Sequence, residues 1–141
     1  MKLTKLCLGL ALLSLAPSAS RADIDGSQPA ICAAIEIMEC IPDEGCARIS
    51  AEQAGIPRFL HVDFANNRVS RTRNGEEISS EIERSEWVDE RLILQGAEDG
   101  LANEPDGIGW SMSIGKAAGD MVLSGSGNGV AFVIFGACTI P

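Results

Sequence analysis

The stretch FLHVDFANNRVSRTRNGEE, residues 59–77, carries the clearest fold signal in the chain. Leu60, Val62 and Phe64 alternate with polar side chains, which is typical of a half-buried β-strand. Asn74-Gly75 is a strong hairpin signal, because both residues tolerate the positive φ that a type I′ turn requires. We therefore predict strands at 59–65, 68–73 and 76–83, with Asn66-Asn67 as the connection between the first two.

These turns predict which residues face each other. A loop at Asn66-Asn67 places Phe64 opposite Val69 and Val62 opposite Arg71. The Asn74-Gly75 turn places Arg73 opposite Glu76 and Arg68 opposite Glu81, and opposite charges in such pairs stabilise a sheet slightly. The same register puts Arg71 on the apolar side, with Ile78. An inward arginine indicates either a handle for a ligand or a bulge or strand end that alters the register, and we favour the latter.

Further strands are expected on both sides of this stretch. Alternating or apolar runs predict strands at 91–96, 108–115, 120–125 and 130–137, separated by glycine-rich turns. Residues 29–41 suit a helix or a strand, and we favour a strand, whereas residues 50–57 indicate a short helical turn. The predicted fold class is mainly β, a single antiparallel meander that closes into a small barrel or a sandwich, with a barrel as our first choice.

The N-terminus has the pattern of a secretory signal peptide. Lys2 and Lys5 precede an apolar run from Leu6 to Ala16, and small residues flank Arg21 at the expected cleavage site. This run is too short to span a membrane. We expect cleavage after Ala22, which leaves a single β domain at 23–141 in the periplasm or outside the cell.

The acidic composition excludes some classes of partner. The 141 residues include 11 Lys and Arg against 20 Asp and Glu, a formal charge of −9. Loss of residues 1–22 removes three bases and no acid, so the mature domain has a charge of −12. Such a charge does not favour nucleic acid or anionic lipid, so we expect neither a nucleic-acid partner nor a membrane span.

Five cysteines become four when Cys7 is removed with the signal peptide: Cys32, Cys40, Cys46 and Cys138. An even number in an exported chain predicts two disulfides. Pro42 and Gly45 indicate a reverse turn between Cys40 and Cys46, so we predict that these two pair and that Cys32 pairs with Cys138. The spacings match neither a zinc site nor a thioredoxin-like redox motif.

No catalytic constellation is visible. The single histidine, His61, has no nucleophile motif to serve, and the glycine-rich residues 124–129 lack the lysine and helix of a phosphate loop. We therefore lean against an enzyme and expect no cofactor and no metal. The acidic segment 98–106 has oxygen ligands suited to Ca²⁺, but its spacing matches no known calcium loop.

A closed barrel would offer a small apolar cavity. The candidate lining residues are Arg71, Trp110, Met112 and Phe132, with Met121 and Phe135 as further members. Trp110 and Met112 also fit a simple core stripe. Trp87 follows a charged run and is expected to be partly exposed, so an apolar patch near it would favour a protein partner.

Several segments give the chain a resemblance to known proteins. They are the two cysteines around the short turn, IPRFLHVD at 56–63, LILQG at 92–96, GWS at 109–111 and FGACT at 135–139. With these, the chain resembles a family of small exported proteobacterial proteins to which no activity is assigned. The resemblance implies a periplasmic or secreted setting in a Gram-negative bacterium and transfers no site residue.

The sequence thus predicts an exported, disulfide-stapled β domain that binds a small apolar ligand or a protein partner. The alternative is a structural or inhibitory envelope protein that acts through a loop or an exposed face.

Overall fold

A computed structural model describes residues 22–73, 75–98 and 107–141 of the chain. This part contains ten strands in one antiparallel sheet and one short helix. The elements are β1 (Ala30–Ile41), β2 (Gly45–Ile49), α1 (Ala51–Ala54), β3 (Phe59–Asp63), β4 (Arg68–Arg73), β5 (Glu76–Glu81), β6 (Arg84–Val88), β7 (Arg91–Glu98), β8 (Ile108–Gly115), β9 (Asp120–Gly127) and β10 (Val130–Thr139).

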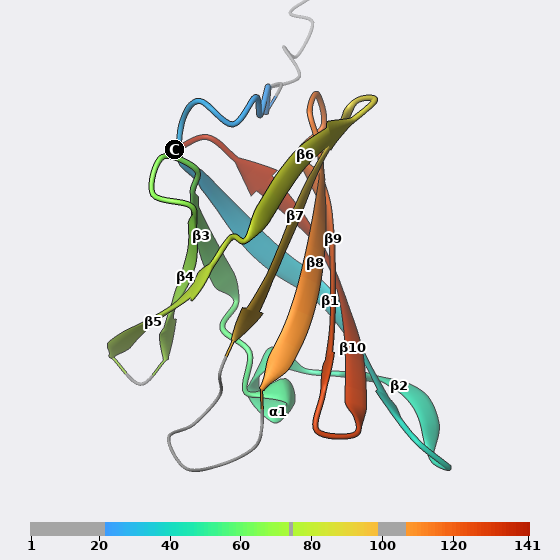
Figure 1. The fold of residues 1–141 in the computed structure, drawn as a ribbon. Coiled ribbons are helices and arrows are strands. Elements are labelled where there is room, and N and C mark those ends of the chain that lie inside the picture. The colour runs from blue at the N-terminus through green and yellow to red at the C-terminus, as the bar shows by residue number, and fades with distance from the viewer. Residues whose placement is uncertain (1–21, 74, 99–106) are drawn as a thin grey trace, which may run out of the picture.

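The sheet curls into a half-barrel, which confirms the predicted mainly β, antiparallel fold class (Figure 1). Its strand order is β5-β4-β3-β1-β10-β9-β8-β7-β6, and β2 pairs with β1 outside this path. Neighbours in the sheet are mostly neighbours in the chain, as in a meander. The exception is β1, which lies between β3 and β10 and so joins the first and last parts of the chain.

Strand β1 is long enough, at 12 residues, to pair with three other strands. Residues Ala30–Ala33 pair with β3, Ile37–Ile41 pair with β2, and β10 pairs along most of the other edge. The β1–β10 register shifts between Ala34 and Glu36, which marks a bulge. Because a bulge bends its strand, it contributes to the curl of the sheet. Residues 29–41 therefore form a strand, as favoured above, rather than a helix.

The two edge strands, β5 and β6, are not paired with each other, and β5 approaches β7 across the open side of the half-barrel. The backbone N–H of Glu83 donates to the carbonyl of Gln95 (2.9 Å), and the N–H of Ile82 donates to that of Asn67 (2.8 Å). The hydroxyl of Ser80 on β5 donates to the carbonyl of Ala97 on β7 (2.9 Å). The Ser80 bond crosses the open side of the half-barrel, whereas the two backbone bonds hold the link between β5 and β6 against β7 and the β3–β4 turn.

The turn between β3 and β4 differs from the prediction. It spans residues 64–67 rather than Asn66-Asn67 alone, so Val62 faces Val69, and the expected Phe64–Val69 and Val62–Arg71 pairs are wrong. The carboxylate of Asp63 accepts hydrogen bonds from the backbone N–H (3.1 Å) and the side-chain amide (2.7 Å) of Asn66. This Asx-type turn ends the strand early. The register changes by two residues, so every side chain keeps its predicted face.

Other local predictions hold. In the β4–β5 ladder, Arg68 faces Glu81 and Arg73 faces Glu76, as predicted. The helical turn is α1, which begins at a Ser50–Gln53 capping box and ends at Gly55 with a positive φ of 63°. Strand β6 was not predicted, because its sequence RSEWV lies in a charged run and all five residues are exposed.

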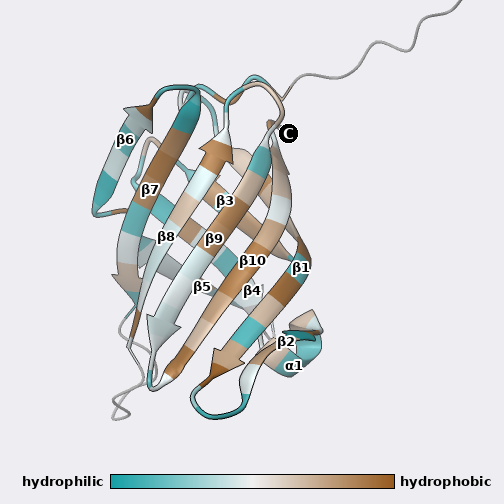
Figure 2. Cartoon of the chain, turned by 90° about the vertical axis from the view of Figure 1, so that its right-hand side faces the viewer, coloured by the Kyte–Doolittle hydropathy of each residue, from teal (hydrophilic) through white to brown (hydrophobic). Residues whose placement is uncertain are grey.

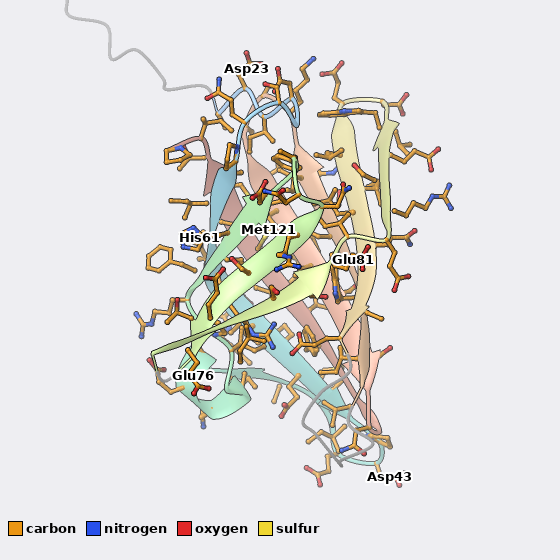
Figure 3. All side chains as sticks on the ribbon, turned by 60° about the vertical axis from the view of Figure 1, so that its left-hand side comes forward. Asp23, Asp43, His61, Glu76, Glu81 and Met121 are labelled. Carbon is orange, nitrogen blue, oxygen red and sulfur yellow. A yellow bond between two sulfur atoms is a disulfide. The ribbon has the colours of Figure 1, made fainter. Side chains whose placement is uncertain are left out.

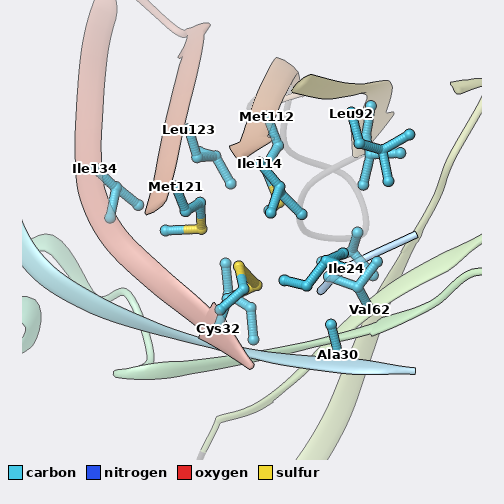
Figure 4. Close-up of a cluster of buried hydrophobic side chains, with 14 of the residues drawn as sticks. Ile24, Ala30, Cys32, Val62, Leu92, Met112, Ile114, Met121, Leu123 and Ile134 are labelled. Carbon is cyan, nitrogen blue, oxygen red and sulfur yellow. A yellow bond between two sulfur atoms is a disulfide. The ribbon is translucent and has the colours of Figure 1, made fainter. Parts of the chain in front are cut away.

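The hydrophobic core fills the half of the barrel farther from α1. Apolar and polar residues alternate along the strands (Figure 2), and the inward apolar ones meet between the two parts of the sheet (Figure 4). Ile24 is completely buried there, beside Val62, and its backbone N–H donates to the carbonyl of Lys116 (2.9 Å). Residues 22–29, which precede β1, thus close the end of the half-barrel that is farther from α1, and we call this segment the plug.

Both predicted disulfides are present. Cys32–Cys138 joins β1 to β10 inside the core, where both residues are buried. Cys40–Cys46 joins β1 to β2 directly across the hairpin. The first crosslinks residues 106 positions apart and the second crosslinks residues only six apart.

Candidate functional site

The half of the barrel nearer to α1 is not filled. A cavity of about 540 Å³ lies between β3–β5 on one side and β8–β10 on the other, with α1 and β2 at its end. The apolar part of its lining comes from Ile49, Ala54, Ile56, Pro57, Leu60, Val69, Ile78, Ile108, Trp110, Leu123, Val130, Phe132 and Ile134. Its charged part consists of Glu39, Glu76, Glu98 and Arg71. Figure 3 shows Glu76 at the same end of the molecule as α1.

One wall of the cavity alternates aromatic residues with glycine. Successive Cα partners across β1, β10, β9, β8 and β7 are Glu39, Phe132, Gly125, Trp110 and Gly96. A Cβ on Gly125 would lie 2.3 Å from Cζ of Phe132, and one on Gly96 would lie 2.5 Å from Cζ2 of Trp110. Each ring therefore covers a neighbouring glycine, and any larger residue would displace it. The row is a flat aromatic wall that begins at the Glu39 carboxylate, and we call it the aromatic row.

Arg71 points into the cavity and pairs with Glu98. Its Nη1 donates to Oε2 of Glu98 (2.6 Å), and its Nη2 contacts the other carboxylate oxygen, so the pair is bidentate. The two side chains are only 20% and 23% exposed. Arg71 is the Cα partner of Ile78 in an unbroken β4–β5 register. Its inward position therefore reflects an ion pair across the barrel and not the bulge or strand end that we favoured from the sequence.

A second polar contact holds the aromatic row in place. Nε1 of Trp110 donates to the hydroxyl of Ser80 (2.8 Å), which in turn donates to the carbonyl of Ala97. Ser80 is buried, and these two bonds satisfy its hydroxyl. The chain of bonds links β8, β5 and β7, so it fixes the Trp110 ring and ties the open side of the half-barrel.

The structure brings together three of the four candidate lining residues, Arg71, Trp110 and Phe132. Met112 lies in the packed core and is completely buried, and Met121 lies there too. Phe135 is on the outer face and is 43% exposed. Glu39 and Glu98 were not expected in the cavity, and Glu98 was considered only as part of the acidic segment 98–106. Their signal, an acidic residue at an inward position of an otherwise apolar strand, is visible only once the face of each strand is known.

The remaining chemistry-bearing residues lie elsewhere. His61 is on the exposed face of β3 (Figure 3). Within the described ranges no group of three or more His, Cys, Asp or Glu residues could hold a metal ion. Of the acidic segment 98–106, only Glu98 lies inside the described residues. Hydrogen bonds to Ser27 and Asn66 lower the pKa values of Asp25 and Asp63, both in surface turns away from the cavity.

Exposed apolar side chains occur in two groups. Trp87 (40% exposed) and Val88 lie on edge strand β6, and the Trp87 ring has Nζ of Lys116 5.8 Å from its centroid. Trp87 is therefore partly exposed, as predicted. The other group, Ile35, Phe59 and Phe135, lies on neighbouring strands β1, β3 and β10.

Comparison with known proteins adds no relative. No family model matches the chain, and no curated protein and no solved structure does either. Among the described residues, no helix has the length and apolar character to cross a membrane.

Proposed function

We propose that this protein binds a small, largely apolar molecule in the cavity of the half-barrel. The observation that carries the proposal is the cavity volume of about 540 Å³, which is within the range of sites for small ligands. Its lining has the composition of such sites, mostly apolar and aromatic side chains with a few placed polar groups. A ligand there would bury its apolar surface against Trp110, Phe132 and the aliphatic residues of β3–β5.

The arrangement of the polar groups favours binding over reaction. Arg71 is held by Glu98, and Ser80 is held by Trp110 and Ala97. Groups that already have partners keep the walls in place and can orient a ligand. A nucleophile next to a base, which would suggest covalent catalysis, does not occur among the described lining residues.

We also propose that the protein acts after export, in the periplasm or outside the cell. Two features support this: the signal-peptide pattern of residues 1–22 and the two disulfides, which persist in oxidising compartments. Ile24, just after the expected cleavage site, is part of the core, so cleavage after Ala22 leaves the plug on the mature chain.

The test uses N-phenyl-1-naphthylamine, a neutral fluorophore whose emission rises in apolar surroundings. We expect the wild-type protein to bind it with saturable enhancement. Ile78→Trp fills the cavity from β5 and should abolish the enhancement. The matched control is Val88→Trp, which adds the same side chain at an exposed position of β6 and should leave binding unchanged.

Circular dichroism shows whether each variant is folded. A second control, Phe135→Ser, removes an exposed apolar side chain from the outer face and should also leave the enhancement unchanged. Undiminished binding by folded Ile78→Trp, or loss of binding in Phe135→Ser, would place the fluorophore outside the cavity and contradict the proposal.

A further inference from the structure

We infer that the ligand is an amphipathic cation, a molecule with an apolar body and an amine or quaternary ammonium head that binds at Glu39. This inference rests on the proposed function and adds the charge of the ligand to it. It follows from the charges that line the cavity, from the position of Glu39 and from the aromatic row.

The charges of the cavity wall leave one carboxylate to a ligand. Arg71 and Glu98 neutralise each other in a bidentate pair. Glu76 is exposed to solvent at the start of β5, so water screens its charge. Glu39 also lines the cavity, and none of the ion pairs among the described residues includes it.

Glu39 lies beside an aromatic ring. It is the Cα partner of Phe132, and both residues line the cavity from the inner face of the sheet. Trp110 follows in the same row, beyond Gly125, whose missing side chain leaves the Phe132 ring flat against the wall. A carboxylate next to exposed aromatic faces suits a cation, because the ring faces and the carboxylate are both negative. When the cationic head of a ligand binds at Glu39, the apolar body of the same ligand can lie along the aromatic row.

An anionic ligand fits the same wall poorly. Arg71 is the only guanidinium among the described lining residues, and Glu98 already occupies it. A ligand carboxylate or sulfonate at Arg71 would displace Glu98 and leave that partly buried carboxylate without its partner. The whole chain, with a formal charge of −9, also attracts cations and repels anions.

The experiment compares two probes of equal chain length, decyltrimethylammonium and decanesulfonate, each below its micellar concentration. Each competes with N-phenyl-1-naphthylamine for the cavity. We expect the cation to displace the fluorophore at a concentration about tenfold lower than the anion, and Glu39→Gln to reduce this preference to about threefold or less. The affinity of Glu39→Gln for the neutral fluorophore is measured first, and each displacement is expressed relative to that value.

The matched control is Glu36→Gln. Glu36 is on the same strand, faces outward and pairs with Arg48 (2.7 Å), so this variant changes the net charge equally without changing the cavity. It should keep the tenfold preference. In the Trp87→Phe background Trp110 is the remaining tryptophan, and a change of its emission with decyltrimethylammonium would locate the cation at the aromatic row.

The outcomes separate the two proposals. Failure of N-phenyl-1-naphthylamine to bind would overturn the proposed function and the inference together. Normal fluorophore binding with equal or stronger displacement by decanesulfonate would overturn only the inference. An unchanged preference in Glu39→Gln, or an equal loss in Glu36→Gln, would also overturn it, because the selectivity would then come from the overall charge and not from Glu39.

Discussion

The two disulfides should contribute very differently to stability. Their loops differ in length, with sequence separations of 106 for Cys32–Cys138 and six for Cys40–Cys46. In the chain-entropy model a crosslink removes freedom from the unfolded chain in proportion to the logarithm of its loop length, which gives about 4.8 kcal/mol for the long loop and about 2.3 kcal/mol for the short one.

The perturbation is to replace both cysteines of one pair with alanine, in two separate variants. We expect the free energy of unfolding to fall by about 5 kcal/mol without Cys32–Cys138 and by about 2 kcal/mol without Cys40–Cys46. Burial acts in the same direction, because Cys32 and Cys138 also lose packing contacts in the core, whereas Cys46 is exposed.

The assay is equilibrium unfolding in urea, followed by circular dichroism. Each curve is fitted with its own slope, since the unfolded chain expands when a crosslink is lost. Both variants lose two sulfurs, so they serve as controls for each other. Equal losses, or a larger loss in the Cys40–Cys46 variant, would refute the reasoning, because neither loop length nor burial would then determine the effect.

Three further changes test other parts of the structure. Ile24→Ala should lower the free energy of unfolding by about 2–5 kcal/mol in urea denaturation, because Ile24 is completely buried in the core; a loss below 1 kcal/mol would show that the plug does not pack as described. Arg71→Met should destabilise the protein by about 3 kcal/mol, because it leaves Glu98 unpaired, and the double variant with Glu98→Met should be the more stable of the two by thermal unfolding; the opposite order would contradict this account of the pair. Hydrogen bonds from the side chain and backbone of Asn66 hold the pKa of Asp63 below its usual 3.8, so Asn66→Ala should raise that pKa in an NMR titration. The pKa of Asp63 is lower in the folded protein than in the unfolded chain, so these bonds stabilise the fold only when Asp63 is ionised. Their contribution to stability should be complete at pH values above the pKa of Asp63 in the unfolded chain, and it should disappear as the pH falls through the pKa of Asp63 in the folded protein. An unchanged pKa in Asn66→Ala would contradict the description of this turn.

Local sequence signals predicted most of the strands, because the alternation and turn residues that mark a strand lie close together in the chain. The turn predicted at Asn74-Gly75 gave the correct β4–β5 register, and the helical turn expected within residues 50–57 is α1. Errors occurred where side chains modified a local pattern. The Asp63–Asn66 hydrogen bonds lengthened one turn, and the exposed strand β6 had no apolar face to reveal it.

The position of β1 could not be predicted in this way. It pairs with β3, β2 and β10, and the last of these lies about 100 residues away in the chain. The Cys32–Cys138 prediction contained part of this information, because a disulfide requires two strands to approach each other. It did not indicate that β1 interrupts the sequential order of the sheet.

The sequence by itself determined the strand-forming segments, the acidic charge, the two disulfides and the inward face of Arg71. These follow from alternation, composition and cysteine number, which are properties of the chain alone. Only the tertiary structure decided that Arg71 pairs with Glu98, that glycines lie beneath Phe132 and Trp110, and that Glu39 shares a cavity with them. The reason is physical: a cavity forms where inward side chains from distant strands do not fill the space between them, so it depends on how the whole sheet curls.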